Sequence, residues 1–194
     1  MSHPSAVAVF CGSKPGQAPE HLASATSLGQ GMAAHDIELV YGGGRVGLMG
    51  AVAAAVQQGD GKVTGIIPDF LMQLEVGNSE AGSLEVTDSM HSRKRRMFEI
   101  SDAFVTLAGG MGTLDETIEV ITWKQLRLHS KPIIVLSIDG YWDILRQTTQ
   151  SFTEAGFAYA SDAELFTIVE SVDAVFEALD REEWVREQTF AGRL

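Results

Sequence analysis

Short runs of apolar residues recur along the chain, and most are followed by a stretch in which apolar residues return at the spacing of a helix. Within the runs, apolar residues follow one another instead of alternating with polar ones, which is typical of parallel strands covered on both faces. The runs predict strands over residues 5–10, 37–41, 62–67, 84–87, 103–107, 132–137 and 165–169.

Helical spacing occupies much of the sequence between these runs. In the first such stretch, for example, Leu28 and Met32 fall on one face of the helix. Asp88 and Ser89 are both candidates to cap the fourth helix at its start. The predicted helices cover residues 19–35, 50–58, 70–74, 89–101, 114–128, 141–154 and 171–180.

Strands that alternate with helices predict an α/β fold, a Rossmann-like doubly wound parallel sheet with helices on both faces. We expect a single domain over residues 1–194, because this length suits one α/β core and no linker, repeat or low-complexity segment occurs. Residues 77–82 are interpreted as a mobile loop, and residues 181–194 as a polar tail that frays or packs on a partner. The ligand of such a sheet binds at the carboxyl ends of its strands.

Two glycine-rich turns lie between a predicted strand and a predicted helix. The first glycine turn runs from Leu107 to Glu116, Leu-Ala-Gly-Gly-Met-Gly-Thr-Leu-Asp-Glu. The second glycine turn, which comes earlier in the chain, runs from Tyr41 to Gly50, Tyr-Gly-Gly-Gly-Arg-Val-Gly-Leu-Met-Gly. Without a Cβ, the backbone N–H groups of such a turn approach an anion closely, and the following helix adds partial positive charge. Gly-x-Gly patterns alone are common, so the strand-to-helix setting makes these turns informative. Together they predict one nucleotide held from two sides.

The chain is strongly acidic. Fourteen Lys and Arg residues stand against 26 Asp and Glu residues, which gives a net charge of −12. This balance repels nucleic-acid backbones and anionic membranes, so we expect neither nucleic acid nor a membrane as a partner. Against this background, the basic run 93–96, Arg-Lys-Arg-Arg, favours a small phosphorylated ligand.

Other features of the composition narrow the class of protein. No run approaches about 18 consecutive apolar residues, and the first residues lack the charged and apolar regions of a signal peptide. A cytoplasmic protein is therefore expected. Cys11 is the only cysteine, which excludes an internal disulfide and a cysteine-based zinc site within one chain. The histidines are scattered without ligand spacing, so we predict no metal.

A set of short motifs in a fixed order identifies a family. These motifs are Cys-Gly-Ser at 11–13, Tyr-Gly-Gly-Gly at 41–44, Val-Gly-Leu-Met-Gly at 46–50, Met-His-Ser-Arg-Lys at 90–94, Gly-Gly-Met-Gly-Thr-Leu-Asp-Glu at 109–116, Val-Ile-Thr-Trp at 120–123 and Asp-Gly-Tyr at 139–141. With them the chain resembles the LOG family, the cytokinin riboside 5′-monophosphate phosphoribohydrolases, whose members were often mislabelled as lysine decarboxylases. The resemblance implies a homodimer or larger assembly that hydrolyses the N-glycosidic bond of a nucleoside 5′-monophosphate, releasing the free base and ribose 5-phosphate.

The chain departs from the family pattern at two places. Ala108 stands where relatives usually have proline, which loosens the turn modestly without removing a group that touches phosphate. Arg95 and Arg96 stand where relatives often have small or acidic residues, a change that bears on substrate preference.

Glu116 and Arg93 are the candidate catalytic residues. Cleavage of an N-glycosidic bond builds positive charge at the ribose C1′, which a nearby carboxylate stabilises. On the resemblance, Glu116 matches the catalytic glutamate and Arg93 the catalytic arginine. A second interpretation of Glu116 stays open, because residues 113–116 also fit a capping box. The guanidinium of Arg93 stays protonated, so it positions groups and stabilises charge instead of acting as an acid.

The remaining candidates bind substrate. Gly109, Gly110, Gly112 and Thr113 are expected to bind the 5′-phosphate, with the Thr113 hydroxyl as an added donor. Plain turn geometry is an equal alternative for any single glycine. The resemblance implies further substrate contacts from the second turn, the first loop and the start of the arginine helix, namely Gly43, Gly44, Ser13, Met90 and Lys94.

These features predict a hydrolase, an N-glycosidase that acts on a cytokinin riboside 5′-monophosphate or on AMP. No lysine has a setting that suggests a pyridoxal phosphate Schiff base, so we reject decarboxylation and expect no cofactor. The alternative is a nucleotide-binding module of the same fold without turnover. A module of that kind needs the glycine turns but neither Glu116 nor Arg93.

Overall fold

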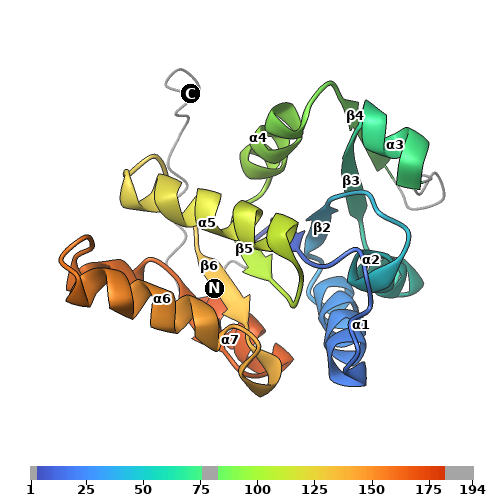
Figure 1. Cartoon of the computed structure of the whole chain (residues 1–194). Helices are drawn as coiled ribbons and strands as arrows, with labels where there is room; N and C mark the ends of the chain where they lie inside the picture. Colours follow the sequence, from blue (N-terminus) through green and yellow to red (C-terminus); the bar gives the residue numbers. More distant parts are fainter. Residues whose placement is uncertain (1–3, 76–82, 182–194) are drawn as a thin grey trace.

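The computed structural model describes residues 4–75 and 83–181 and contains a seven-stranded parallel sheet in the order β4-β3-β2-β1-β5-β6-β7 (Figure 1). The strands are β1 Ala6–Phe10, β2 Glu38–Tyr41, β3 Val63–Pro68, β4 Ser83–Thr87, β5 Ala103–Thr106, β6 Ile133–Leu136 and β7 Thr167–Val169. The helices are α1 Pro19–Ala34, α2 Gly47–Gln58, α3 Asp69–Glu75, α4 Met90–Ile100, α5 Met111–Gln125, α6 Asp143–Glu154 and α7 Val172–Arg181, with short 3₁₀ helices η1 Ile138–Gly140 and η2 Ala160–Glu164. The predicted doubly wound α/β fold is confirmed.

Helices cover both faces of the sheet, which explains why inner strands such as β1 are apolar, whereas the edge strand β4, Ser83–Thr87, is polar in part and only partly buried (Figure 1). Val7 and Val9 of β1 face one core, to which α1, α2 and α7 contribute. Ala8 and Phe10 face the other core, with side chains from α4, α5 and α6. Since every position of such a strand is buried, no polar residue interrupts it.

The order of the strands reverses between β1 and β5. The chain steps outward from β1 through β2 and β3 to β4, and α4 then returns it to β5, which pairs with the other side of β1. The helices that follow β1 and β5, namely α1 and α5, therefore pack on opposite faces of the sheet. In open parallel sheets this switch point opens the crevice in which ligands bind.

The predicted elements are all present, and the largest shifts in their boundaries, three residues each, are at the starts of α2 and α5 and at the end of α5, which is Gln125 instead of residue 128. Helix α2 begins at Gly47 instead of residue 50, and α5 at Met111 instead of residue 114. Leu114 is the first apolar side chain of α5 that packs against the core, and Met111 is 81% exposed. Helical periodicity therefore starts later than the helix itself. The predicted loop at 77–82 and the tail from 182 lie outside the described residues.

No helix within residues 4–75 and 83–181 combines the length and the apolar character that a membrane span requires.

Candidate active site

The loops that follow β1 and β5 are bound to each other through Gly12. Its N–H donates to the Ala108 carbonyl at 2.9 Å, and its carbonyl accepts from the N–H groups of Leu48 and Met49 at 3.1 and 3.4 Å. Two backbone amides at the start of α2 thus donate to another part of the chain. The second glycine turn, residues 41–50, therefore holds the loop of Gly12 in place, and its Leu48 and Met49 amides are not free for an anion.

Helix α5 begins with its amide groups uncapped by any side chain. Gly110 is the residue before the helix, and no side-chain hydrogen bond closes this end. Thr113 and Glu116 lie inside the helix, so the capping-box interpretation of these residues is wrong. Uncapped N–H groups together with the helix dipole attract an anion.

The three glycines of this turn differ in what they face. A Cβ on Gly109 would collide with the Thr113 side chain and lie 2.9 Å from the Gly12 nitrogen, so close packing requires glycine there. A Cβ on Gly110 or Gly112 would meet nothing within 4 Å. These two glycines therefore face open space, which a ligand can fill.

Two aromatic residues after β6 hold the turn in place. The Tyr141 hydroxyl donates to the Gly109 carbonyl at 2.6 Å, and the Trp142 indole N–H donates to the Leu107 carbonyl at 3.1 Å. Tyr141 was predicted only as part of the Asp-Gly-Tyr motif. An aromatic pair directly after an Asp-Gly turn can be recognised in the sequence, but the sequence does not show that Tyr141 contacts a turn more than thirty residues away.

A cavity of about 480 Å³ lies over this turn. Five predicted substrate-binding residues line it, namely Ser13, Gly109, Gly110, Gly112 and Thr113. Residues 11–16 form one wall, and His21, Leu48, Met49 and Tyr141 complete the lining with residues 108–113. The structure therefore brings the first loop and the first glycine turn together around one space.

Arg93 and Glu116, the predicted catalytic residues, form a buried ion pair, and neither of them lines this cavity. The Arg93 Nη1 lies 3.4 Å from the Glu116 Oε1, and the two residues are 5% and 6% exposed. Burial raises the pKa of Glu116 above its ordinary value, and the charge of Arg93 opposes this rise. A carboxylate that is buried beside one fixed cation is suited to stabilise positive charge on a bound molecule.

The position of Arg93 depends on contacts from other elements. Its Nε donates to the Ile66 carbonyl on β3 at 3.1 Å, and its Nη1 lies 3.8 Å from the Met90 Sδ. A Cβ on Gly42 would collide with the guanidinium, so the turn after β2 leaves room for it. Gly42 belongs to the Tyr-Gly-Gly-Gly motif but was not among the predicted site residues.

The other predicted binding residues lie outside the cavity lining. Gly43 has a φ of +75°, and a Cβ there would come within 3.1 Å of the Ile67 Cβ, so this glycine packs against β3. Gly44 is buried in the same turn. Met90 begins α4 beside Arg93. The ammonium of Lys94 lies 3.1 Å from the Asp115 carboxylate and 3.0 Å from that of Glu119.

The two arginines that depart from the family pattern form surface ion pairs. Arg95 pairs with Glu99 on the same helix at 2.8 Å, as expected for a solvated face. Arg96 donates to both carboxylate oxygens of Glu85 on β4 at 2.9 Å. Neither residue lines the cavity.

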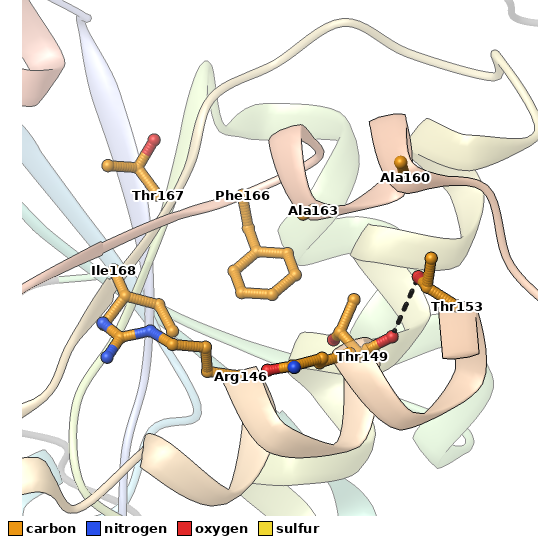
Figure 2. Close-up of a pocket in the computed structure, with 9 residues that line it drawn as sticks. Arg146, Thr149, Thr153, Ala160, Ala163, Phe166, Thr167 and Ile168 are labelled. Carbon is orange, nitrogen blue, oxygen red and sulfur yellow. Dashed lines mark hydrogen bonds between the residues drawn. The ribbon is translucent and has the colours of Figure 1, made fainter. Parts of the chain in front are cut away.

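A second cavity, of about 610 Å³, lies at the β7 edge of the sheet between α6 and η2 (Figure 2). The Phe166 ring lines this cavity, as do Thr149 and Thr153. The hydroxyls of these two threonines donate to carbonyls of their own helix. Arg146 lies 3.6 Å from Asp143. This cavity shows no buried charged pair like that of Arg93 and Glu116. Among the described residues, no group of three or more His, Cys, Asp or Glu side chains is placed to hold a metal ion.

Comparison with solved structures places the fold among known proteins. A molybdenum cofactor binding protein from the phototrophic bacterium Rippkaea orientalis is similar with a TM-score of 0.69 and 23% identity, over 93% of this chain and 97% of the other. The Moco carrier protein of Chlamydomonas reinhardtii is similar with a TM-score of 0.67 and 22% identity, over 91% and 98%. At this identity the likeness concerns the fold alone.

Comparison of sequences is more specific. A family model described as "Possible lysine decarboxylase" matches residues 49–179. A probable cytokinin riboside 5′-monophosphate phosphoribohydrolase of Oryza sativa subsp. japonica is 44% identical over 174 residues, which cover 90% of this chain and 77% of the rice protein. A cytokinin riboside 5′-monophosphate phosphoribohydrolase of Arabidopsis thaliana is 40% identical over 174 residues, 90% of this chain and 81% of that protein. The chain therefore belongs to the LOG family of cytokinin riboside 5′-monophosphate phosphoribohydrolases.

Proposed function

We propose that the protein hydrolyses the N-glycosidic bond of an adenine-type nucleoside 5′-monophosphate, a cytokinin riboside 5′-monophosphate or AMP, and releases the free base and ribose 5-phosphate. One observation carries this proposal: the uncapped start of α5 lies on the same helix as Glu116, which is buried against Arg93. Membership of the LOG family supports it.

The start of α5 is the proposed seat of the 5′-phosphate. Backbone N–H groups of the first helical turn of α5 donate to the phosphate oxygens, and Gly110 and Gly112 leave the space that the phosphate occupies. Thr113 adds a hydroxyl at the edge of the cavity. A phosphate held there fixes the ribose relative to Glu116 on the same helix.

Glu116 is the proposed catalytic residue. As the bond between C1′ and the base nitrogen breaks, its electron pair leaves with the base and positive charge develops on the ribose ring. The carboxylate stabilises that charge and orients the water whose oxygen forms the new bond to C1′. In the overall reaction, one proton of this water ends on the base nitrogen and the hydroxyl group remains on C1′. The charge of Arg93 opposes the rise that burial causes in the pKa of Glu116, and so favours the ionised carboxylate.

A nucleotide-binding module without turnover would use the same phosphate seat. It would have no need of a carboxylate buried beside an arginine, since a buried charge lowers stability unless it is paired. The Arg93–Glu116 pair therefore favours the enzyme.

Product analysis tests the proposed reaction. Purified protein is incubated separately with AMP and with isopentenyladenosine 5′-monophosphate, and the products are separated by chromatography. We expect free base and ribose 5-phosphate in equal amounts, and the ratio of the two rates identifies the preferred substrate. Binding of both nucleotides without release of base would contradict the enzyme and support the binding module.

The glycines that face open space give a separate test of the phosphate seat. In Gly112→Ala the new methyl group meets no protein atom, so we expect the melting temperature to stay within a few degrees. The same methyl group reduces the room for the phosphate, so KM for the nucleotide should rise about tenfold or more. Thermal unfolding and steady-state kinetics measure the two effects. An unchanged KM would place the phosphate elsewhere.

We also propose a homodimer or larger assembly in the cytoplasm. Helix α5 exposes Met111 and Ile118, and Leu126 directly after the helix is exposed too, which supports an apolar contact along this helix. Trp123 is half-buried and packs edge-on against Phe98 of α4. Light scattering after size-exclusion chromatography measures the assembly.

A further inference from the structure

One short segment, residues 129–131, is hydrogen-bonded to both helices that carry the proposed catalytic residues. The Lys131 ammonium donates to the Phe98 carbonyl of α4 at 2.6 Å. The His129 Nε2–H donates to the Val120 carbonyl of α5 at 2.9 Å. The segment lies just before β6, so the far halves of both helices are fastened to the same end of one strand.

The proposed catalytic residues, Arg93 on α4 and Glu116 on α5, lie nearer the starts of these helices. Phe98 follows Arg93 by five residues, and Val120 follows Glu116 by four. At a rise of about 1.5 Å per residue, each catalytic residue is about 6 to 8 Å along its helix from the carbonyl that is bound. The distance of 3.4 Å between Nη1 and Oε1 spans the two helices, so it depends on their spacing.

We propose that His129 and Lys131 are positioning residues for this interhelical ion pair: each binds the backbone of one helix, and together they set the spacing of α4 and α5. They act on the reaction through the helices. The inference rests on the proposed function, because the ion pair whose geometry they set is the one proposed to catalyse hydrolysis.

The hydrogen bonds of His129 fix its protonation state and its orientation. Its Nδ1 accepts from the Lys131 backbone N–H at 3.1 Å, and its Nε2 donates to the Val120 carbonyl, so the ring is the neutral imidazole with the proton on Nε2. Burial lowers the pKa of His129 to about 4, which keeps the ring neutral near pH 7. The ring also packs edge-on against Phe98, with the centroids 5.1 Å apart.

Lys131 supplies the positive charge that the end of α4 lacks. Residues 97–100 include no Lys, Arg or His, and the last four carbonyl groups of a helix have no partner within it. The Lys131 ammonium binds one of these carbonyls at the negative end of the helix dipole, and it lies 4.1 Å from the centroid of the Phe98 ring. Burial lowers the pKa of Lys131 to about 8, so the ammonium is largely charged at pH 7.

The glycine turn at the start of α5 is held by different contacts. Tyr141 donates to the Gly109 carbonyl and Trp142 to the Leu107 carbonyl. Loss of the bonds from residues 129–131 therefore leaves the proposed phosphate seat in place. The proposal accordingly predicts an effect on kcat with little effect on KM.

Four variants test the proposal at pH 7, each well below its melting temperature. Lys131→Met removes the ammonium, and His129→Leu removes both hydrogen bonds of the ring without a change of charge. Lys131→Arg and His129→Gln keep a donor for the helix carbonyl and are the conservative controls. We expect kcat to fall about tenfold in each of the first two variants, with KM within about twofold, and to return to within about threefold of the wild type in the controls.

A double variant separates positioning from a general loss of stability. In Glu116→Gln the ion pair is already absent, so the addition of Lys131→Met should lower the residual rate by less than about twofold. A role in stability alone would lower the melting temperature in both backgrounds and leave kcat unchanged at a temperature where the protein is folded.

A titration of the free protein gives a readout that does not depend on turnover. The ¹³C NMR signal of the Glu116 side-chain carboxyl, assigned by its loss in Glu116→Gln, is followed against pH. We expect its midpoint to lie at higher pH in His129→Leu, because a more distant Arg93 opposes less of the rise that burial causes. A neutral side chain replaces a neutral ring, so a lost charge cannot cause the movement. Other charged groups near this carboxyl are unchanged in the variant, namely Lys94, Asp115 and Glu119.

An unmoved midpoint in His129→Leu, or a kcat unchanged in both Lys131→Met and His129→Leu, overturns the proposal. A tenfold loss that recurs in the Glu116→Gln background also overturns it, because the effect would then not pass through the ion pair. The two residues are tested independently, so the test stands even where one variant does not fold. If the wild type releases no base from either nucleotide, the proposed function fails, whereas the titration still decides whether His129 sets the geometry of the ion pair.

Discussion

Glu116→Gln is expected to lower kcat by about a thousandfold, while the protein still folds and still binds nucleotide. Glutamine has nearly the shape of glutamate, so the packing around this 6% exposed residue changes little. What is lost is the negative charge that stabilises the ribose cation and orients water. Base release measured by chromatography gives kcat, and calorimetry with AMP gives the affinity.

Glu99→Gln is the matched control for this change. Glu99 lies on α4, its side chain is 43% exposed, and it pairs with Arg95 on the surface, so the same chemical change should leave kcat within about twofold. Hydrolysis by Glu116→Gln at the rate of the wild type would remove Glu116 from the reaction, even if the protein binds nucleotides.

Arg93→Met is expected to lower both activity and stability. Without the guanidinium, Glu116 is buried with no ion-pair partner among residues 4–75 and 83–181, which costs about 3 kcal/mol or is relieved by protonation of the carboxyl group. A protonated Glu116 cannot stabilise a cation, so kcat should fall about a hundredfold or more near neutral pH. Urea denaturation measures the loss of stability, and the product assay measures the loss of activity.

Two further variants separate the charge of Arg93 from its packing. The double variant Arg93→Met/Glu116→Gln removes both buried charges, so much of the lost stability should return although activity does not. Arg95→Met is the matched control, because Arg95 is 55% exposed and forms only a surface pair; its effect should stay within about 0.5 kcal/mol. If Arg93→Met were as stable as Arg95→Met, the buried pair would have no structural role.

The fold could be predicted from the sequence because its signals are local and repeated. Apolar runs such as that of β1 appear directly in the order of the residues, and so do the glycine turns at the ends of β2 and β5. The predicted α/β sheet and the order of its elements follow from them. The seat at the start of α5 could be predicted for the same reason, since one short segment supplies both the glycines and the helix.

The second glycine turn shows the limit of such signals. Its composition resembles that of the first, and both were predicted to hold the nucleotide. In the structure, the amides of Leu48 and Met49 bind the Gly12 carbonyl, a residue distant in sequence. A local pattern cannot show whether a free N–H group meets a ligand or another part of the chain.

Lys94 and Glu116 show the same difference for charged side chains. The sequence by itself determined the class of fold, the position of the proposed phosphate seat and the identity of the residues that carry charge, because periodicity, glycine content and residue type are properties of short segments. Only the tertiary structure decided that Glu116 is a buried partner of Arg93 instead of a helix cap, and that Lys94 binds Asp115 and Glu119. The physical reason is that burial and charge pairing depend on distances between α4 and α5, which the packing of both helices on the sheet sets.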